Sequence, residues 1–133
     1  MILFLDTVSP IPKFIIIKDY KIIELIPILE HNITKISDNI IQKYLVLDKK
    51  YNLNETLIKL VVCSGPGSFT SLRVGISFIY GLSFSKNIPL YGISSTELLG
   101  CHIKEKYFYN TLLFVISANN QNFVCFPSTN SNK

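Results

Sequence analysis

The sequence predicts an α/β domain in which helices cover a mixed β-sheet. Three short apolar runs come first, within residues 2–26, with no helical periodicity between them. After residue 33, segments with apolar residues at every third or fourth position alternate with further short apolar runs. Neighbouring strands favour a hairpin, whereas strands that alternate with helices favour parallel pairing, so one sheet should contain both kinds of pairing.

Length and composition favour one folded domain of ordinary size. The chain has 133 residues, of which 48% are hydrophobic and 17% are charged. These values exclude a disordered or low-complexity protein. The net charge of +4 is mildly basic, and Arg73 is the only arginine. Because readers of base edges rely mainly on arginine, direct reading of a nucleic-acid sequence by this chain is not indicated.

Several features indicate a cytoplasmic protein that does not contact a membrane. No basic segment precedes the apolar start MILFL, and Asp6 interrupts it, so no signal peptide is predicted. No apolar run reaches the ~18 residues of a membrane-spanning helix. The cysteines are odd in number and widely spaced, without a C-x-x-C pair, and we expect them to be buried free thiols in a reducing compartment. They are Cys63, Cys101 and Cys125.

The first half of the chain should contain a strand, a hairpin and a helix. Residues 2–5 form a short apolar run that ends at Asp6, and residues 14–17 and 21–26 are two β-rich runs close together. A helix with Asn32 as its N-cap follows, because one apolar face repeats at intervals of three and four. That face consists of Ile33, Ile36, Ile40, Tyr44 and Leu47. A polar linker, Tyr51 to Glu55, comes next.

The second half continues the alternation and completes the order βββ-α-β-α-β-α-ββ. Strands are expected at residues 60–63, 90–93, 112–116 and 123–126. A helix should run from Ser68, its cap, to Lys86, and Ser94 or Ser95 should cap another that extends through Gly100. The first five strands and their helices form a complete layered unit. We expect the last two strands to add to this unit or to be covered by another chain, so the isolated protein should self-associate.

The segment CSGPGSFTSLRVG, residues 63–75, combines a strand, a glycine loop and a helix N-terminus, which in principle makes an anion site. The lysine of a phosphate loop is absent, and Thr70 stands at the last glycine position of G-x-G-x-x-G. A structural turn is therefore the favoured interpretation. Asp6 could hold a metal ion or its water near a phosphate, but capping of its own loop is the simpler role. At most, a degenerate phosphate loop would comprise Asp6, Gly65, Gly67, Ser68 and Thr70.

No other catalytic or metal-binding set is predicted. His31 has no histidine or carboxylate three or four residues further on, and His102 has only Glu105, so no H-x-x-x-H or H-E-x-x-H metal site is predicted. Ser64 and Ser68 lack the G-x-S-x-G context of a nucleophile, and Cys63 ends a buried strand. We therefore expect no catalytic residue, no metal and no cofactor.

Three stretches together resemble one protein family. GPGSFTSLRVG, with GISSTELLG after it and ILFLDT at the start, is similar to the TsaB family, also called YeaZ, from the first strand to Gly100. The resemblance implies an actin- and sugar-kinase-like lobe of the ribonuclease H-like kind, with a mixed five-stranded sheet in βββαβαβα order. Residues 1–109 would form this lobe, residues 110–127 the start of a truncated second lobe, and residues 128–133 a solvated tail. Ser71 and Ser117-Ala118-Asn119 depart from the family's glycine and D-A-R.

The resemblance also implies a function. TsaB-like proteins are regarded as non-catalytic scaffold or dimerisation subunits in the formation of threonylcarbamoyladenosine at position 37 of tRNAs that read ANN codons. A TsaD-like catalytic subunit would be the partner, a TsaE-like ATPase would join them, a homodimer could form, and tRNA would be contacted only indirectly. The alternative is a nucleotide-binding phosphotransferase or hydrolase lobe that uses Asp6 and the loop from Gly65 to Thr70. Nucleotide binding discriminates between the two.

The helix from Ser68 to Lys86 is the place where a partner is expected to bind. Its apolar residues form two faces, and a helix on a sheet needs only one, so the other should meet a partner helix. The resemblance points to the same helix, because TsaB-like proteins pair through a helical bundle. The expected interface contains Leu72, Gly75, Ile76, Phe78 and Ile79, together with Ile36, Ile40 and Tyr44 of the preceding helix.

Overall fold

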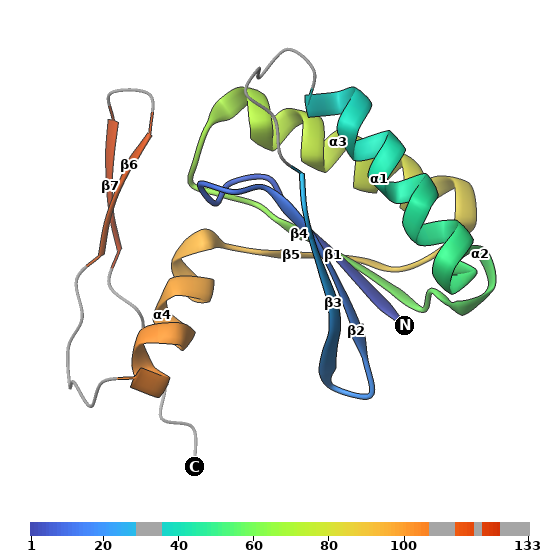
Figure 1. The fold of residues 1–133 in the computed structure, drawn as a ribbon. Helices are drawn as coiled ribbons and strands as arrows, with labels where there is room; N and C mark the ends of the chain where they lie inside the picture. The colour runs from blue at the N-terminus through green and yellow to red at the C-terminus, as the bar shows by residue number, and fades with distance from the viewer. Residues whose placement is uncertain (29–35, 107–113, 119–120, 126–133) are drawn as a thin grey trace.

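The computed structural model describes residues 1–28, 36–106, 114–118 and 121–125 (Figure 1). Within these ranges, no helix is long and apolar enough to cross a membrane. The elements are β1 (Ile2–Asp6), β2 (Lys13–Lys18), β3 (Lys21–Pro27), α1 (Ile36–Tyr51), α2 (Leu53–Thr56), β4 (Lys59–Cys63), α3 (Phe69–Lys86), β5 (Leu90–Ile93), α4 (Ser95–Lys106), β6 (Phe114–Ala118) and β7 (Gln121–Cys125).

Five strands form one mixed sheet in the order β3-β2-β1-β4-β5. β1 pairs antiparallel with β2, and β2 pairs antiparallel with β3. On its other side β1 pairs parallel with β4, which in turn pairs parallel with β5. The predicted mixed sheet with an opening hairpin is therefore confirmed.

The core lies between one face of this sheet and the helices α1 and α3, which both cover that face (Figure 1). Alternate residues of a strand point to the same face, and the register aligns Leu5 of β1 with Phe14 of β2 and Val62 of β4. All three side chains are buried. The helices contribute the apolar residues that the 3.6-residue period predicted for α1, namely Ile36, Ile40, Tyr44 and Leu47.

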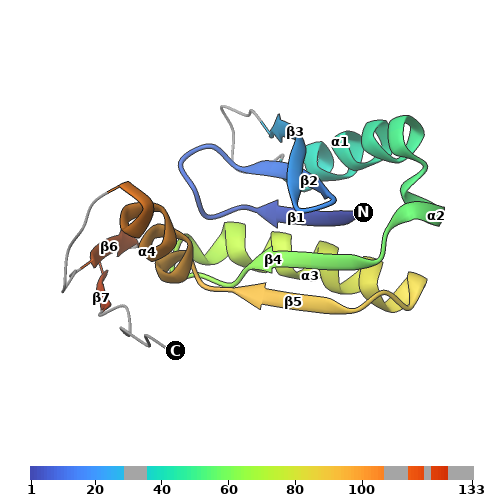
Figure 2. The ribbon, with the colours of Figure 1, turned by 90° about the horizontal axis from the view of Figure 1, so that it is seen from below.

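The opposite face of the sheet, which we call the open face, is not covered by α1 or α3. Figure 2 views the molecule from this side and shows α4 at one end of the face. Leu25 and Tyr91 on the open face are exposed, and the register aligns Leu25 with Ile15. Parallel strands are normally buried on both faces, so an uncovered face beside β4 and β5 is unusual. We define the open face by Ile2, Phe4, Ile15, Ile17, Ile22, Leu25, Val61 and Tyr91, of which the central Phe4 is buried.

The helix ends agree partly with the sequence-based predictions. The expected cap Asn32 and the start at Ile33 lie outside the described residues, and α2 occupies part of the expected polar linker. Helix α3 follows Ser68 and ends at Asn87, whose φ is 53°, although Ser68 makes no capping hydrogen bond. Helix α4 extends beyond Gly100 to Lys106, so the predicted end was wrong.

A capping box begins α4, as expected for Ser94. The backbone N–H of Glu97 donates to Ser94 Oγ at 3.1 Å, and the Ser94 N–H donates to Glu97 Oε2 at 2.9 Å. The Ser94 hydroxyl also donates to Glu97 Oε2 at 2.7 Å, and the two hydrogen bonds that this carboxylate accepts from Ser94 lower its pKa.

The strands β6 and β7 pair with each other and form a separate two-stranded antiparallel sheet. The predicted strands are thus present, with β6 starting two residues later and β7 two residues earlier than expected. They do not extend the five-stranded sheet. The expected solvated tail, residues 128–133, lies outside the described residues.

Candidate functional site

The Asp6 carboxylate at the end of β1 is buried and holds its own loop. Oδ1 accepts hydrogen bonds from the backbone N–H of Val8 at 2.9 Å and of Ser9 at 3.0 Å. Oδ2 accepts the Ser9 hydroxyl and lies 3.5 Å from Lys13 Nζ. Both carboxylate oxygens are therefore engaged by the segment that leads from β1 into β2. This arrangement agrees with the prediction that Asp6 caps its own loop.

The glycine loop between β4 and α3 packs directly on this segment. A Cβ added to Gly67 would overlap with the Val8 side chain, so Val8 lies against the backbone of the loop. In a phosphate loop the ligand approaches the backbone at such a glycine. Gly65, with φ at 93°, has a backbone conformation that side-chain-bearing residues rarely adopt.

The polar groups of the glycine loop also serve the fold. The buried Ser95 at the start of α4 donates twice to the loop, from its N–H to the carbonyl oxygen of Gly65 and from its hydroxyl to that of Pro66, both at 2.8 Å. Ser68 and Thr70, the remaining candidates for a phosphate loop, lie at the start of α3. Thr70 is exposed, and the Ser68 hydroxyl accepts a hydrogen bond from Ser71 Oγ at 3.3 Å. The loop is thus a packed strand-to-helix turn.

No metal site is found among the described residues, where no three side chains of His, Cys, Asp or Glu come together. His31 lies outside the described residues, and so does the His102 side chain. Cys63 is buried, and burial raises the pKa of its thiol. Cys101 is exposed. The absence of a metal and of a cofactor stays a prediction.

Helix α3 approaches β1 closely through its glycine. A Cβ added to Gly75 would lie 2.5 Å from Thr7 Oγ1 and 2.8 Å from Thr7 Cγ2. Ile79, one turn further, is completely buried. The side of α3 that carries Gly75 and Ile79 therefore meets the chain's own sheet, which periodicity alone did not reveal. The predicted interface residues on this buried side of the two helices are Ile36, Ile40, Tyr44, Gly75 and Ile79.

Three aromatic rings join the two helices to the sheet. Phe78 of α3 packs edge-to-face on Tyr44 of α1, with ring centroids 5.5 Å apart, and on Phe14 of β2 at 6.2 Å. The Tyr44 hydroxyl is buried and finds no hydrogen-bond partner in the described part of the chain, and burial raises the pKa of Tyr44 to about 12. This cluster fixes the position of α3 relative to α1.

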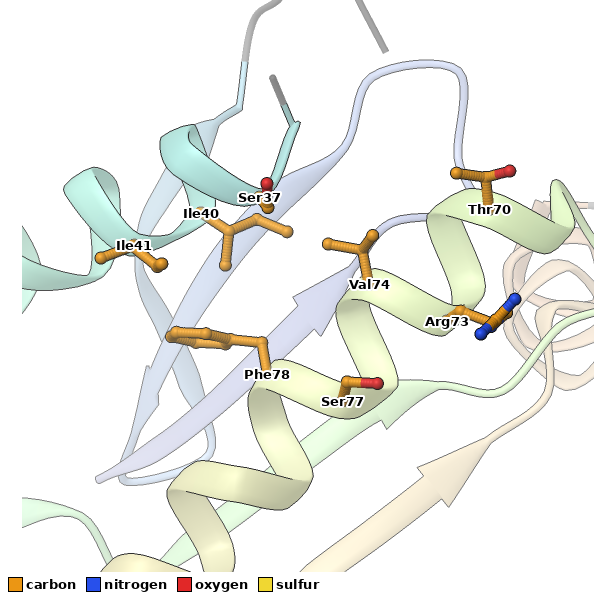
Figure 3. Close-up of a pocket in the computed structure, with 8 residues that line it drawn as sticks. All are labelled: Ser37, Ile40, Ile41, Thr70, Arg73, Val74, Ser77 and Phe78. Atoms are coloured by element: carbon orange, nitrogen blue, oxygen red, sulfur yellow. The ribbon is translucent and has the colours of Figure 1, made fainter. Parts of the chain in front are cut away.

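Between α1 and α3 lies a groove of about 530 Å³ (Figure 3). Ile40, Val74 and Phe78 form its apolar part, and Arg73 lies near one end with its guanidinium 5.3 Å from the Phe69 ring. The exposed Ile41 also lines the groove. The other lining residues are the polar Ser37, Thr70 and Ser77.

The outer surface of the two helices carries further exposed apolar side chains. Ile76, Tyr80 and Phe84 follow one another at four-residue intervals, so they form a stripe along α3. Leu45 is exposed one turn after Ile41 on α1. Of the predicted interface residues, Ile76 belongs to this surface, Phe78 reaches the groove, and Leu72 is partly buried. We call the set Ile41, Leu45, Val74, Ile76, Phe78, Tyr80 and Phe84 the helical surface.

Sequence reasoning did not include Ile41 and Leu45 in the interface. Each lies beside the buried stripe of α1, at positions where an apolar side chain is not needed for the core. Apolar residues beside the buried stripe were the feature of the sequence that could have indicated these two interface positions. The sequence did not reveal on which flank of α1 the helix α3 would lie.

Comparison with known proteins connects this fold to tRNA modification. The family model for TsaD, tRNA N6-adenosine threonylcarbamoyltransferase, matches residues 32–132. A Bacillus subtilis (strain 168) protein, "tRNA threonylcarbamoyladenosine biosynthesis protein TsaB", is 40% identical over 48 residues, which cover 36% of this chain and 21% of that protein. The protein of the same name from Buchnera aphidicola subsp. Schizaphis graminum is 32% identical over 76 residues, which cover 57% of this chain and 36% of that protein.

Two solved structures from Pseudomonas aeruginosa share the fold. YeaZ matches with a TM-score of 0.67 and 18% identity, over 89% of this chain and 55% of that one. An uncharacterized protein with similarity to peptidase YeaZ matches with a TM-score of 0.67 and 20% identity, over 94% of this chain and 56% of that one. The likeness confirms the fold, a mixed five-stranded sheet with flanking helices. The chain spans a little over half the length of these structures.

Proposed function

This chain belongs to the family that the TsaD model describes and, within it, to the TsaB/YeaZ proteins, and from this premise we propose that it serves threonylcarbamoyladenosine formation as a non-catalytic scaffold. Its partner is a TsaD-like subunit, which transfers the threonylcarbamoyl group to adenosine 37 of ANN-decoding tRNAs. A TsaE-like ATPase joins the pair. Residues 1–109 act as the lobe that presents the interface, and residues 110–127 begin a second lobe.

The observation that carries this proposal is the helical surface. Helices in an α/β domain normally expose polar residues to solvent, whereas α1 and α3 expose Ile41, Leu45, Tyr80 and Phe84 beside an apolar groove. Full burial of one such side chain is worth about 1.5–3 kcal/mol. A partner helix that covers several of them gains enough to offset the ordering of both surfaces. A second copy of this chain could cover the same surface and would then compete with the TsaD-like subunit.

The alternative, a nucleotide-binding lobe, receives no support from the glycine loop. The Asp6 carboxylate already accepts three hydrogen bonds, and Val8 lies where a phosphate would approach Gly67. Binding of ATP with micromolar affinity that is lost in Asp6→Ala would revive this alternative.

The scaffold proposal is tested with two charge substitutions on α1. Ile41 lines the groove and is 48% exposed, whereas Val46 is 57% exposed and points away from it, about 140° around the helix from Ile41. Ile41→Asp places a charge in the interface and should weaken binding to the TsaD-like subunit of the same organism at least about 30-fold. Val46→Asp should bind as the unchanged protein does.

Titration calorimetry with both proteins purified measures the affinities, and circular dichroism verifies that each variant is folded. Equal affinity of Ile41→Asp, Val46→Asp and the unchanged chain would show that the helical surface is not the interface. If the unchanged chain did not bind the subunit, the scaffold role itself would be wrong.

A further inference from the structure

The turn between β2 and β3 carries an aromatic residue in a strained conformation. Asp19 and Tyr20 both have left-handed backbones, with φ at 51° and 61°. Two-residue hairpin turns of this kind prefer glycine at the second position, and an aromatic residue there is a rare exception. The Tyr20 side chain is fully exposed. It therefore contributes nothing to the core, and glycine would serve the turn better.

The same end of the molecule gathers six of the thirteen basic side chains. Ile2 aligns with Ile17 of β2 and with Lys59 of β4, so the hairpin turn and the start of β4 lie at the same end of the sheet. Figures 1 and 2 show the N-terminus, α2 and the end of α3 at this end as well. Its lysines, which we call the basic end, are Lys18, Lys21, Lys49, Lys50, Lys59 and Lys86.

Acidic residues neutralise the basic end only in part, because four carboxylates, those of Asp19, Glu24, Asp48 and Glu55, lie there against six lysines. Of those nearby, Glu24 pairs with Lys50 at 2.8 Å. Asp48 accepts hydrogen bonds from Asn54, and Glu55 accepts one from Asn52. Lys18 and Lys21 are exposed and flank Tyr20 on either side of the turn. Two exposed lysines thus flank the exposed Tyr20 along the turn, together with the exposed Asp19.

We propose that the basic end binds RNA, with its lysines on phosphates and Tyr20 stacked on an unpaired base. Lysines supply affinity for a phosphodiester backbone without reading its sequence. Proteins recognise RNA largely through unpaired bases that stack on aromatic side chains. A ring held at the tip of a hairpin, at a cost in backbone strain, suits such a base. The inference rests on the proposed function, because that function makes the RNA a tRNA. The chain would then contact the tRNA directly.

The test measures binding of the full chain to a fluorescently labelled transcript of an ANN-decoding tRNA by anisotropy, at several salt concentrations. Tyr20→Gly should weaken binding about tenfold, the value of one lost stacking contact. Because glycine relieves the strained turn, this variant should be at least as resistant to heat as the unchanged chain. A loss of affinity therefore cannot be ascribed to unfolding.

A second variant tests the charges. Lys18→Gln combined with Lys21→Gln should reduce the slope of log affinity against log salt by about 1.5, because each phosphate contact contributes about 0.7–0.9. Lys43→Gln removes an exposed lysine from the middle of α1, away from the basic end, and should leave both affinity and slope unchanged.

Affinity unchanged in Tyr20→Gly, or a salt slope unchanged in the double lysine variant, would overturn the proposal. The proposal would also be overturned if Tyr20→Gly weakened binding to a blunt DNA duplex as much as binding to the tRNA. Binding of the chain to phosphatidylserine vesicles but not to the tRNA would overturn it as well. Ile41→Asp should retain RNA binding, since the helical surface lies elsewhere. An unchanged chain that binds the TsaD-like subunit but not tRNA would refute this inference and leave the proposed function standing.

Discussion

The hydroxyl group of Tyr44 is buried and has no hydrogen-bond partner among the residues that the structure describes. A buried polar group without a partner has lost its bond to water and costs about 1–3 kcal/mol. Its ring, by contrast, packs well on Phe78, with centroids 5.5 Å apart. The ring and the hydroxyl therefore have opposite effects on stability, and a substitution can separate them.

We expect Tyr44→Phe to stabilise the protein by about 1 kcal/mol, because it keeps the ring and removes the unpaired hydroxyl. Urea unfolding followed by circular dichroism measures the change. Tyr51→Phe is the matched control, because Tyr51 lies on the same helix and is only partly buried, so the removal of its hydroxyl group should not stabilise the protein. A loss of stability in Tyr44→Phe would indicate that its hydroxyl has a partner in solution.

At the scale of elements, the two glycines of α3 have opposite roles. A Cβ on Gly75 would press on Thr7, whereas a Cβ on Gly81 would meet nothing within 4 Å. Gly75→Ala should therefore destabilise the protein by about 1–3 kcal/mol through overpacking. Gly81→Ala should stabilise it by about 0.5–1 kcal/mol, since glycine is a poor helix former.

Thermal unfolding of the two variants provides the comparison. Thr7→Ala should restore part of the stability lost in Gly75→Ala, because it removes the atoms with which the new methyl group collides. If Gly75→Ala and Gly81→Ala changed stability equally, helix propensity would dominate, and the close approach of α3 to β1 would not matter.

An ion pair connects strand β3 to the end of α1. Lys50 Nζ lies 2.8 Å from Glu24 Oε1, and the hydrogen bond from Lys50 is the main cause that lowers the pKa of Glu24. Because the pKa of Glu24 is lower in the folded state, the ion pair stabilises the protein at pH values above the unfolded pKa of about 4.5. This contribution is lost as the pH falls through the pKa of Glu24 in the folded state.

Glu24→Gln should therefore lower the urea midpoint slightly at pH 7 and leave it unchanged at pH 2.5, because the pair is exposed and of small value. Glu55→Gln, which changes an exposed carboxylate hydrogen-bonded to Asn52, serves as a control without the lysine contact. If the urea midpoints of Glu24→Gln and the unchanged chain differed more at low pH than at pH 7, the predicted pH dependence of the ion pair would be wrong.

The elements that bury one clear face were predictable from the sequence. The stripe from Ile36 to Leu47 repeats at helical intervals because α1 covers the sheet with one side. Helix α2 was missed because four residues are too few to show a period, and only Leu53 in it is buried. Gly100 did not end α4, since glycine is compatible with a helix interior when the surrounding chain continues it.

The candidate site was predictable only in outline. The glycine loop, Asp6 and the importance of α3 follow from local residue types, which the sequence displays directly. Which flank of α3 is buried depends on the close approach of Gly75 to Thr7, two residues far apart in the sequence. The interface list therefore contained residues of the core, such as Ile79 and Ile40, beside the exposed Ile76.

For the whole molecule, the arrangement of layers leaves two apolar surfaces instead of one. Helices α1 and α3 cover one face of the sheet and present the helical surface to solvent. Among the helices that the structure describes, only α4 lies at the open face, at one end of it, and Leu25 and Tyr91 there are exposed (Figure 2). Self-association was expected from the trailing strands alone. The open face gives a stronger reason, because it combines exposed apolar side chains with the unpaired edge of β3.

We expect the isolated chain to self-associate as its concentration rises, and Leu25→Lys to reduce this tendency. Leu25 lies on the edge strand, 52% exposed on the open face, where a lysine opposes both face-to-face and edge-to-edge contacts. Ile11→Lys is the matched control, because Ile11 is 51% exposed but lies in the loop between β1 and β2. Sedimentation velocity from micromolar to millimolar concentration follows the distribution of species. Monomer at every concentration for the unchanged chain, or equal effects of the two lysines, would mean that the open face does not drive association.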